Sequence, residues 1–339
     1  RDKLVTGVQT CALPIYMILT MYVAVEDTPE NDERVMNVAV EQSLYAGELG
    51  FNPWYTEHHF RGPWHSNPIQ FASFIAPQIP KDRYLGFGVL SLPYYNPVRL
   101  VEQMNMLDML TKGRTLFGLG SGFTGIEPTG MGVDEAYHRS GRASEDTINI
   151  MEKLWDYRTG DPEFAYATDT HQGVVKRRVT PAPYRKRRPI CVRTAGRDEQ
   201  LVKAAKRGMP VFVGTFSAES PIEQQLRIYH RALAEAGHPR EVVEECLRWT
   251  TVDWLAVVVA ETDEEAVKRA HIARDEHLAG RKIFTSKHGD LHGPVIKKSG
   301  AHVTPSFASG GDMHDLIAGS PDTVAKRVQK LAEIGRAHV

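Results

Sequence analysis

The chain has 339 residues, of which 42% are hydrophobic, and its formal net charge is -1. A chain of this length can bury one large core or two of ordinary size. A charge this close to zero creates no basic field that would attract nucleic acid or an anionic membrane, so we expect neither partner and favour a small-molecule substrate. The three cysteines, Cys11, Cys191 and Cys246, form no Cys-x-x-Cys motif. Their spacing argues against a disulfide framework or a thiolate metal site and favours the reducing cytoplasm.

Both ends of the chain carry unusual sequence. The apolar run within residues 1–16 is broken by Thr, Gly and Gln, so it is a poor signal peptide. Residues 5–15 resemble a translated sequencing adapter, and residues 334–339 resemble the matching adapter. We therefore expect a non-native leader over 1–16, a single domain over 17–333 and a non-native tail over 334–339 that replaces a truncated C-terminus.

From Met17 onward, apolar runs of strand length alternate with amphipathic helical segments. Continuous apolar runs are typical of parallel strands that helices cover on both faces. The predicted strands are 18–25, 51–55, 85–92, 115–120, 190–193, 211–213 and 255–260. The predicted helices are 30–49, 67–79, 98–110, 139–157, 199–207, 221–236, 264–279 and 323–333.

This alternation predicts an α/β fold, a (β/α)8 TIM barrel that lacks its last strand and helix. Two polar segments interrupt it, and we interpret 160–188 and 280–319 as irregular insertions. An open doubly wound sheet is the alternative. That fold requires a phosphate loop after the first strand, where Glu26-Asp27-Thr28-Pro29 places acidic residues instead.

A carboxylate and two imidazoles, Glu57, His58 and His59, follow the second predicted strand, and the two histidines are the candidate catalytic residues. The carboxyl ends of barrel strands carry the chemistry of this fold. Since side chains alternate along a strand, Glu57 and His59 should face one way and His58 the other. An imidazole can act as acid or base at neutral pH. The alternative interpretation is a buried, hydrogen-bonded histidine pair that only fills a strand end.

A glycine series, Gly118, Gly120 and Gly122, follows the fourth predicted strand. It is weak as a dinucleotide fingerprint because no helix opens directly from this loop. Close approach of the backbone to a ligand is the better interpretation.

Six motifs together resemble one enzyme family. They are Glu57-His58-His59-Phe60, Ser66-Asn67-Pro68, Gly88-Val89-Leu90-Ser91-Leu92-Pro93, Asn96-Pro97-Val98-Arg99-Leu100-Val101-Glu102-Gln103, Leu107-Asp108-Met109-Leu110-Thr111-Lys112-Gly113-Arg114 and Phe117-Gly118-Leu119-Gly120-Ser121-Gly122. Their order and spacing resemble those of the bacterial luciferase-like flavin-dependent monooxygenases over residues 17–154. The resemblance continues more loosely as far as residue 333.

The resemblance implies an EC 1.14-like TIM-barrel enzyme that takes reduced FMN from a separate NAD(P)H:flavin reductase. It implies a C4a-hydroperoxyflavin formed with O2, insertion of one oxygen atom into a small organic substrate, and a homodimer. His58 is the implied catalytic residue, and His59 is our second choice. Glu57 should lie beside the isoalloxazine ring, and Gly88-Val89 should form a cis peptide under it.

The resemblance also places Gly120 and Ser121 at the cofactor. Luciferase itself has a phosphate-binding arginine at the position of Ser121, so the phosphate here needs another partner. Our candidates are Thr194, Ala195, Gly196 and Arg197, which precede a helix start that offers backbone N-H groups and the positive end of its dipole. Arg197 would be a bidentate phosphate partner, and an ordinary surface arginine is the alternative.

Three other functions stay open. Relatives that use the deazaflavin F420 usually have Asp-His where this chain has Glu57-His58-His59. A metal hydrolase is disfavoured because adjacent histidines on a strand cannot easily ligate one ion, so we expect no metal. A non-catalytic flavin-binding protein would share the fold. For a monooxygenase, we expect Phe60, Phe87, Val89, Leu90 and Phe123 to keep water from the flavin.

Overall fold

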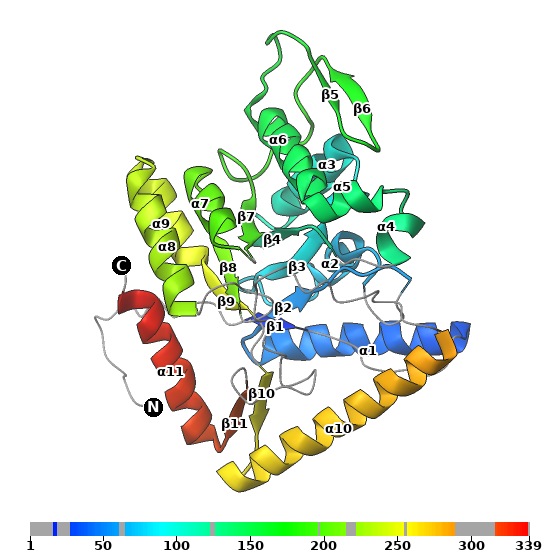
Figure 1. Ribbon diagram of the computed structural model, residues 1–339, viewed down its shortest axis with the longest axis vertical. Coiled ribbons are helices and arrows are strands. Elements are labelled where there is room, and N and C mark those ends of the chain that lie inside the picture. The colour runs from blue at the N-terminus through cyan, green and yellow to red at the C-terminus, as the bar shows by residue number, and fades with distance from the viewer. Residues whose placement is uncertain are drawn as a thin grey trace.

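The computed structural model describes residues 16–18, 28–60, 65–122, 126–195, 197–214, 222–253, 256–288 and 316–337. Its centre is a parallel sheet in the order β1-β2-β3-β4-β7-β8-β9, with a parallel β10-β11 pair further along the chain and helices outside the strands (Figure 1). The strands are β1 (Tyr16–Ile18), β2 (Asn52–Tyr55), β3 (Leu85–Ser91), β4 (Thr115–Gly120), β7 (Ile190–Thr194), β8 (Val211–Gly214), β9 (Thr251–Asp253), β10 (Ala256–Val259) and β11 (Leu316–Gly319).

The helices occupy most of the connections between these strands. They are α1 (Pro29–Glu48), α2 (Pro68–Ile75), α3 (Pro97–Leu110), α4 (Ile126–Gly130), α5 (Glu135–Ser140), α6 (Arg142–Asp156), α7 (Asp198–Lys206), α8 (Ile222–Glu235), α9 (Arg240–Trp249), α10 (Asp263–His288) and α11 (Pro321–Ala337), with the 3-10 turn η1 (Leu92–Tyr94). Strand order follows chain order, as expected for successive right-handed β-α-β units.

The helix starts follow from local chemistry. Thr28 caps α1 by accepting from the Asn31 N-H at 3.2 Å, and Pro29 occupies the first turn, where a missing N-H has no cost. Ser320 caps α11 in the same way, accepting from the Thr323 N-H at 3.4 Å. The predicted helix 139–157 is instead two helices, because Gly141 adopts φ 77° and ends α5 before α6 begins.

Two predicted insertions contain regular structure. Within 280–319, α10 continues to His288 and β11 pairs with β10, so a strand that we expected to be lacking is present. Its four residues fall within the predicted insertion because the sequence before them shows no helical or strand periodicity. Within 160–188, β5 (Phe164–Ala167) and β6 (Gln172–Val175) form an antiparallel hairpin. The strand predicted over 18–25 falls largely on 19–27, outside the described residues.

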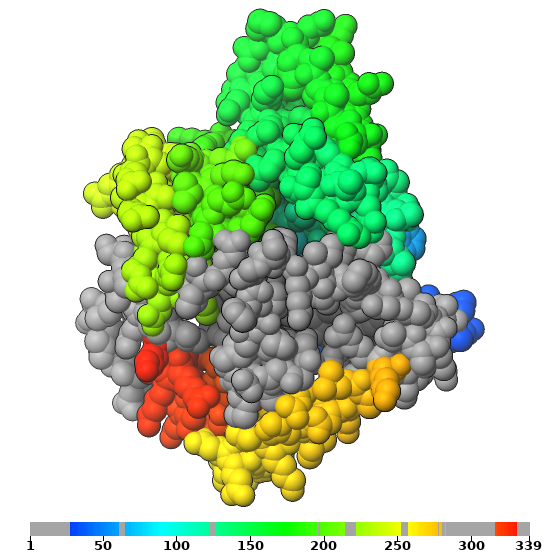
Figure 2. Space-filling model, in the orientation of Figure 1, coloured from blue at the N-terminus to red at the C-terminus, as the bar shows by residue number. Residues whose placement is uncertain are grey.

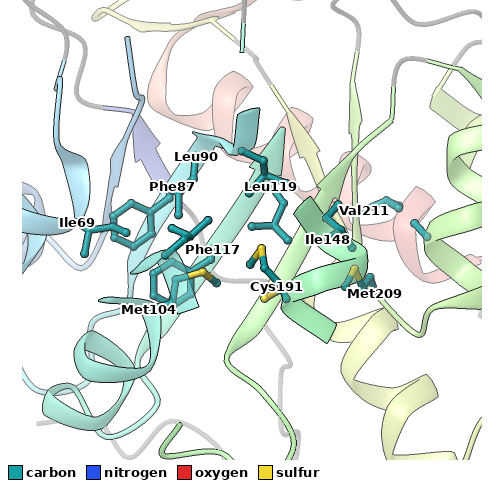
Figure 3. Close-up of a cluster of buried hydrophobic side chains, with 14 of the residues drawn as sticks. Ile69, Phe87, Leu90, Met104, Phe117, Leu119, Ile148, Cys191, Met209 and Val211 are labelled. Carbon is teal, nitrogen blue, oxygen red and sulfur yellow. The ribbon is translucent and has the colours of Figure 1, made fainter. Parts of the chain in front are cut away.

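The two faces of the sheet bury different side chains. Phe87 and Phe117 stack at 4.9 Å with an interplanar angle of 4° in the larger core, which also contains side chains of α3, α6 and α7 (Figure 3). The opposite face packs Trp54, Phe212 and their neighbours into a second cluster. Phe87 and Leu90 therefore lie under helices rather than on the inner face, which corrects our expectation that they wall a flavin.

The buried carboxylate of Asp108 fixes the chain where it returns from the hairpin. Its Oδ1 accepts from Thr115 Oγ1 at 2.9 Å, and its Oδ2 accepts from the Tyr184 N-H at 2.8 Å and the Arg185 N-H at 3.3 Å. Asp108 thereby joins α3, β4 and the segment before β7. The region around β5 and β6 projects at one end of the molecule (Figure 2), so this anchor controls how the projecting segment rejoins the sheet.

We expect Asp108→Ala to lower the free energy of unfolding by about 3 kcal/mol, because one buried and two partly buried donors lose their acceptor. Urea unfolding followed by circular dichroism measures the change. Asp156→Ala removes an exposed carboxylate at the end of α6 and should stay within about 0.5 kcal/mol of the parent. Equal losses in both variants would contradict the anchoring role.

Candidate active site

Glu57 lies at the carboxyl end of β2, where it joins two neighbouring strands. Its side chain is 3% exposed. Oε1 contacts His59 Nε2 at 2.8 Å, and Oε2 accepts from the Ser91 N-H at 2.8 Å, at the last residue of β3. The Tyr95 hydroxyl also bonds this carboxylate. Burial, and then the charge of Glu57, raise the pKa of Tyr95 well above its ordinary value, so Tyr95 remains a phenol and donates.

The adjacent histidine points to a different carboxylate. His58 Nδ1 lies 3.0 Å from Oε1 of Glu127, which is fully buried in the short helix α4. The same oxygen accepts from the His59 N-H at 3.4 Å. His59 bonds Glu57 while His58 bonds Glu127, so the two imidazoles have different carboxylate partners. The site thus contains two carboxylate-imidazole pairs, and the two imidazoles belong to residues that are adjacent in the sequence.

The middle of β3 is built around small residues. The Gly88-Val89 peptide is cis, as the family resemblance implies, and the β3-β4 register shifts between Phe87 and Leu90. A Cβ added to Gly88 would lie 1.9 Å from Trp54 Nε1, so the indole ring occupies that space. In β4, a Cβ added to Gly120 would lie 2.4 Å from Val89 Cγ2. These glycines are therefore required by close packing of β2, β3 and β4.

Beyond β4, Ser121 lies beside a row of rings. Its carbonyl oxygen bonds His138 Nε2 at 2.6 Å, and its hydroxyl accepts from Ser144 Oγ at 2.8 Å. The Tyr94 ring stacks on His138 at 6.1 Å and meets the His59 ring edge-on at 5.5 Å. Burial lowers the pKa of His138, and the Ser121 carbonyl opposes that shift. Ser121 is thereby connected through side chains to the Glu57-His59 pair.

The loop after β7 holds the predicted phosphate residues. Thr194 Oγ1 donates to the Leu119 carbonyl at 3.4 Å, next to Gly120, and Ala195 is buried. Arg197 precedes the first turn of α7 and forms an ion pair with Glu199 at 3.1 Å. Gly196 lies outside the described residues. Thr194 is thus brought to the glycine end of β4, while the charge of Arg197 is shared with a neighbouring carboxylate.

Comparison with known proteins gives the family. A model described as luciferase-like monooxygenase matches residues 17–338. The chain belongs to the luciferase-like monooxygenase family. Limonene 1,2-monooxygenase of Rhodococcus erythropolis is 25% identical over 88% of this chain and 73% of its own. The alkanal monooxygenase alpha chain of Photobacterium leiognathi is 27% identical over 64% and 60%. The luciferase-like chain thus spans about 60% of the alkanal monooxygenase relatives.

Solved structures agree on the fold. The monooxygenase RslO1 of Streptomyces bottropensis has a TM-score of 0.69 at 18% identity, covering 95% of this chain and 89% of its own. The oxygenating constituent of 3,6-diketocamphane monooxygenase from Pseudomonas putida, solved with FMN, has a TM-score of 0.65 at 18% identity, covering 96% and 90%. The fold is therefore the α/β barrel of the luciferase-like type, and the chain is an oxidoreductase of this family.

Several residues of this luciferase-like site carry no sequence signal that we recognised. Glu127 lies in α4, within a segment predicted as a long loop after the fourth strand, and no sequence motif around it marks a partner for His58. Tyr95 and His138 also join the site from loops and short helices. Phe60, expected as a wall, is 57% exposed, and Phe123 lies outside the described residues.

One feature of this site suits a bound flavin: it contains buried polar atoms without hydrogen-bond partners among the described residues. Thr56 Oγ1, Ser91 Oγ and His138 Nδ1 are buried at the ends of β2 and β3 and beside Ser121, and none has a hydrogen-bond partner in the described part of the chain. Buried polar atoms are normally satisfied. The three atoms lie at or beside the carboxyl ends of neighbouring strands, with Ser91 two residues beyond the cis peptide, and could bond the polar atoms of a ring system. Across the described ranges, no cluster of three or more His, Cys, Asp or Glu side chains could hold a metal ion. No described helix has the length and hydropathy to span a membrane.

Next to this luciferase-like site, His65 is a buried titratable group. Its backbone forms an isolated parallel β-bridge with the backbone of Glu57, and its ring packs against Tyr55 and Phe71. Burial lowers the pKa of His65 to about 4, opposed by a contact with the Thr56 backbone. The folded protein therefore binds this proton less readily than the unfolded chain, whose histidines titrate near about 6.5.

Because the pKa of His65 is lower in the folded protein than in the unfolded chain, this group makes the folded state less stable as the pH falls. The stabilisation is fully present above about pH 6.5 and is lost as the pH falls towards about 4, because only the unfolded chain is protonated in that window. We expect a loss of about 3 kcal/mol from this group across the window. Urea unfolding at several pH values checks it against His65→Leu, which should lose less stability over the same window. Parallel curves would contradict the assignment.

Proposed function

We propose that this protein is the oxygenating component of a two-component monooxygenase, which uses reduced FMN and O2 to oxygenate a small organic substrate. The observation that carries the proposal is the pair of buried carboxylate-imidazole contacts, Glu57-His59 and Glu127-His58, at strand ends beside the cis Gly88-Val89 peptide. Family membership and the FMN-bound structural neighbour support it.

The protein's own residues have distinct tasks in this proposal. Reduced FMN, when bound, supplies the electrons that activate O2. Glu57, Gly88, Val89, Gly120 and Ser121 would hold the ring system, and Thr194, Ala195, Gly196 and Arg197 would hold the phosphate. His58 would move one proton at the reacting centre, with His59 as the second choice.

The partners complete the proposal. An NAD(P)H:flavin reductase supplies the reduced cofactor, the chain forms a homodimer, and the enzyme works in the cytoplasm. Two cysteines that are free and buried, Cys191 and Cys246, agree with a reducing compartment.

Anaerobic titration with reduced FMN, followed by product analysis with a reductase, NADH, O2 and a panel of aldehydes, ketones and terpenes, tests the proposal. We expect saturable binding and incorporation of one atom of 18O from O2 into product. A neighbour of the same fold, an F420-dependent secondary alcohol dehydrogenase, has a TM-score of 0.60 at 12% identity, so reduced F420 is titrated in parallel. Tighter binding of F420 would replace the proposal with a deazaflavin oxidoreductase, and FMN binding without any oxygenated product would replace it with a flavin-binding protein.

A further inference from the structure

Glu127 contacts the proposed catalytic histidine directly. Oε1 lies 3.0 Å from His58 Nδ1 and accepts from the His59 N-H at 3.4 Å. The carboxylate is fully buried and His58 is 7% exposed. At this burial, a carboxylate-imidazole contact is far stronger than at the surface, and it fixes the orientation of the ring.

The chemistry of the two groups determines the tautomer. A carboxylate can only accept hydrogen bonds, so the ring nitrogen that faces it must carry the hydrogen. In the neutral imidazole of His58, Nδ1 then bears the hydrogen and Nε2 bears the lone pair. His59 has the opposite arrangement, since its Nε2 faces Glu57. Each of the two adjacent histidines is thus held by its own carboxylate through a different ring nitrogen.

Helix α4 also contacts the turn that follows His58 and His59, through Phe60 and Gly130. Phe60 adopts φ 59°, and a Cβ added to Gly130 of α4 would lie 2.4 Å from the Phe60 ring. With glycine at position 130, the Phe60 ring packs directly on α4, and an alanine there would require the exposed ring to move. This contact keeps α4 close to the turn that carries His58 and His59.

We propose that Glu127 is a positioning residue that holds His58 as the Nδ1-H tautomer, so that Nε2 accepts the proton that the reaction transfers. The inference rests on the proposed function for the role of His58. The orientation of the imidazole itself can be measured without any turnover. Loss of the carboxylate should impair the proton transfer step and leave cofactor binding intact.

The first test is a spectrum of the native enzyme. Selective 15N labelling of histidine, with the His58 signals assigned by their loss in His58→Gln, reports which ring nitrogen carries the hydrogen at a pH where the imidazole is neutral. We expect a protonated Nδ1 and an unprotonated Nε2. A protonated Nε2 would overturn the inference, whether or not the enzyme oxygenates any substrate.

The second test is Glu127→Gln, in which the amide can donate to Nδ1 and so favours the other tautomer. We expect kcat to fall about 100-fold or more, with KM and reduced-FMN affinity changed less than about threefold. Glu127→Asp should recover part of kcat because the carboxylate is restored.

Thr129→Ala is the matched control, since Thr129 is exposed on the same helix, and it should leave kcat unchanged. An unchanged kcat in folded Glu127→Gln would overturn the inference, as would a rise in KM that accounts for the whole loss. If His58→Gln itself retains full activity, the proposed role of His58 fails, and the 15N spectrum still decides whether Glu127 sets the tautomer.

Discussion

Replacing His58 by glutamine is expected to lower kcat for oxygenation by about 10²- to 10⁴-fold, the range typical of removing a general acid or base. His58 is the imidazole paired with Glu127, and its ring is held at the carboxyl end of β2 beside the cis peptide of β3. Glutamine is similar in size and polar, so the fold and reduced-FMN affinity should be retained. Single-turnover kinetics with pre-bound reduced FMN measure the loss without interference from the reductase.

His59→Gln is the matched comparison because it removes the neighbouring imidazole. His59 bonds Glu57 and contacts the Tyr94 ring edge-on. Its loss should therefore mainly disturb the packing and hydrogen bonds around the site, and should affect the proton transfer step less. We expect a smaller fall in kcat than in His58→Gln. The opposite order would assign the proton transfer to His59, and equal wild-type rates in both variants would remove the histidines from the mechanism.

Much of the fold was predictable because it depends on local sequence signals. Apolar runs bounded by turns gave β2, β3, β4, β7 and β8 within one or two residues of their observed limits. β11 was missed since four apolar residues after a long polar segment carry no periodicity. The hairpin of β5 and β6 was also missed, because its alternating exposure leaves it polar overall.

The site could be predicted only where its residues are neighbours in the sequence, at the end of β2. The expected alternation after β2 groups Glu57 with His59 and sets His58 apart, which agrees with the observed partners of the two histidines. The partners that orient them, Glu127 and Tyr95, come from segments whose placement depends on tertiary packing. A sequence pattern does not encode a contact between residues 69 positions apart, so the second carboxylate of the site could be found only in the structure.

The second large effect is expected at Glu57, where alanine should lower the free energy of unfolding by about 3–5 kcal/mol. Its carboxylate is the acceptor for His59 Nε2, the Ser91 N-H and the Tyr95 hydroxyl, of which Ser91 is fully buried and the other two residues are partly buried. Alanine leaves these three donors without their acceptor and disconnects the ends of β2 and β3. Urea unfolding gives the change in stability, and fluorescence titration with FMN shows whether the cofactor site weakens with it.

Glu57→Gln separates charge from hydrogen bonding, because the amide oxygen can still accept from one donor while its NH2 group opposes another. We therefore expect a loss of stability between those of the parent and Glu57→Ala. Glu102→Ala removes a partly exposed carboxylate on α3, whose ion pair with Arg99 lies at the surface, and should change stability by less than about 1 kcal/mol. If Glu57→Ala unfolds at the same urea concentration as Glu102→Ala, Glu57 does not hold the strand ends together. The register that brings the cis peptide beside the histidines would then come from other β2-β3 contacts, namely the backbone pairing of the two strands and the packing of Trp54 against Gly86 and Gly88.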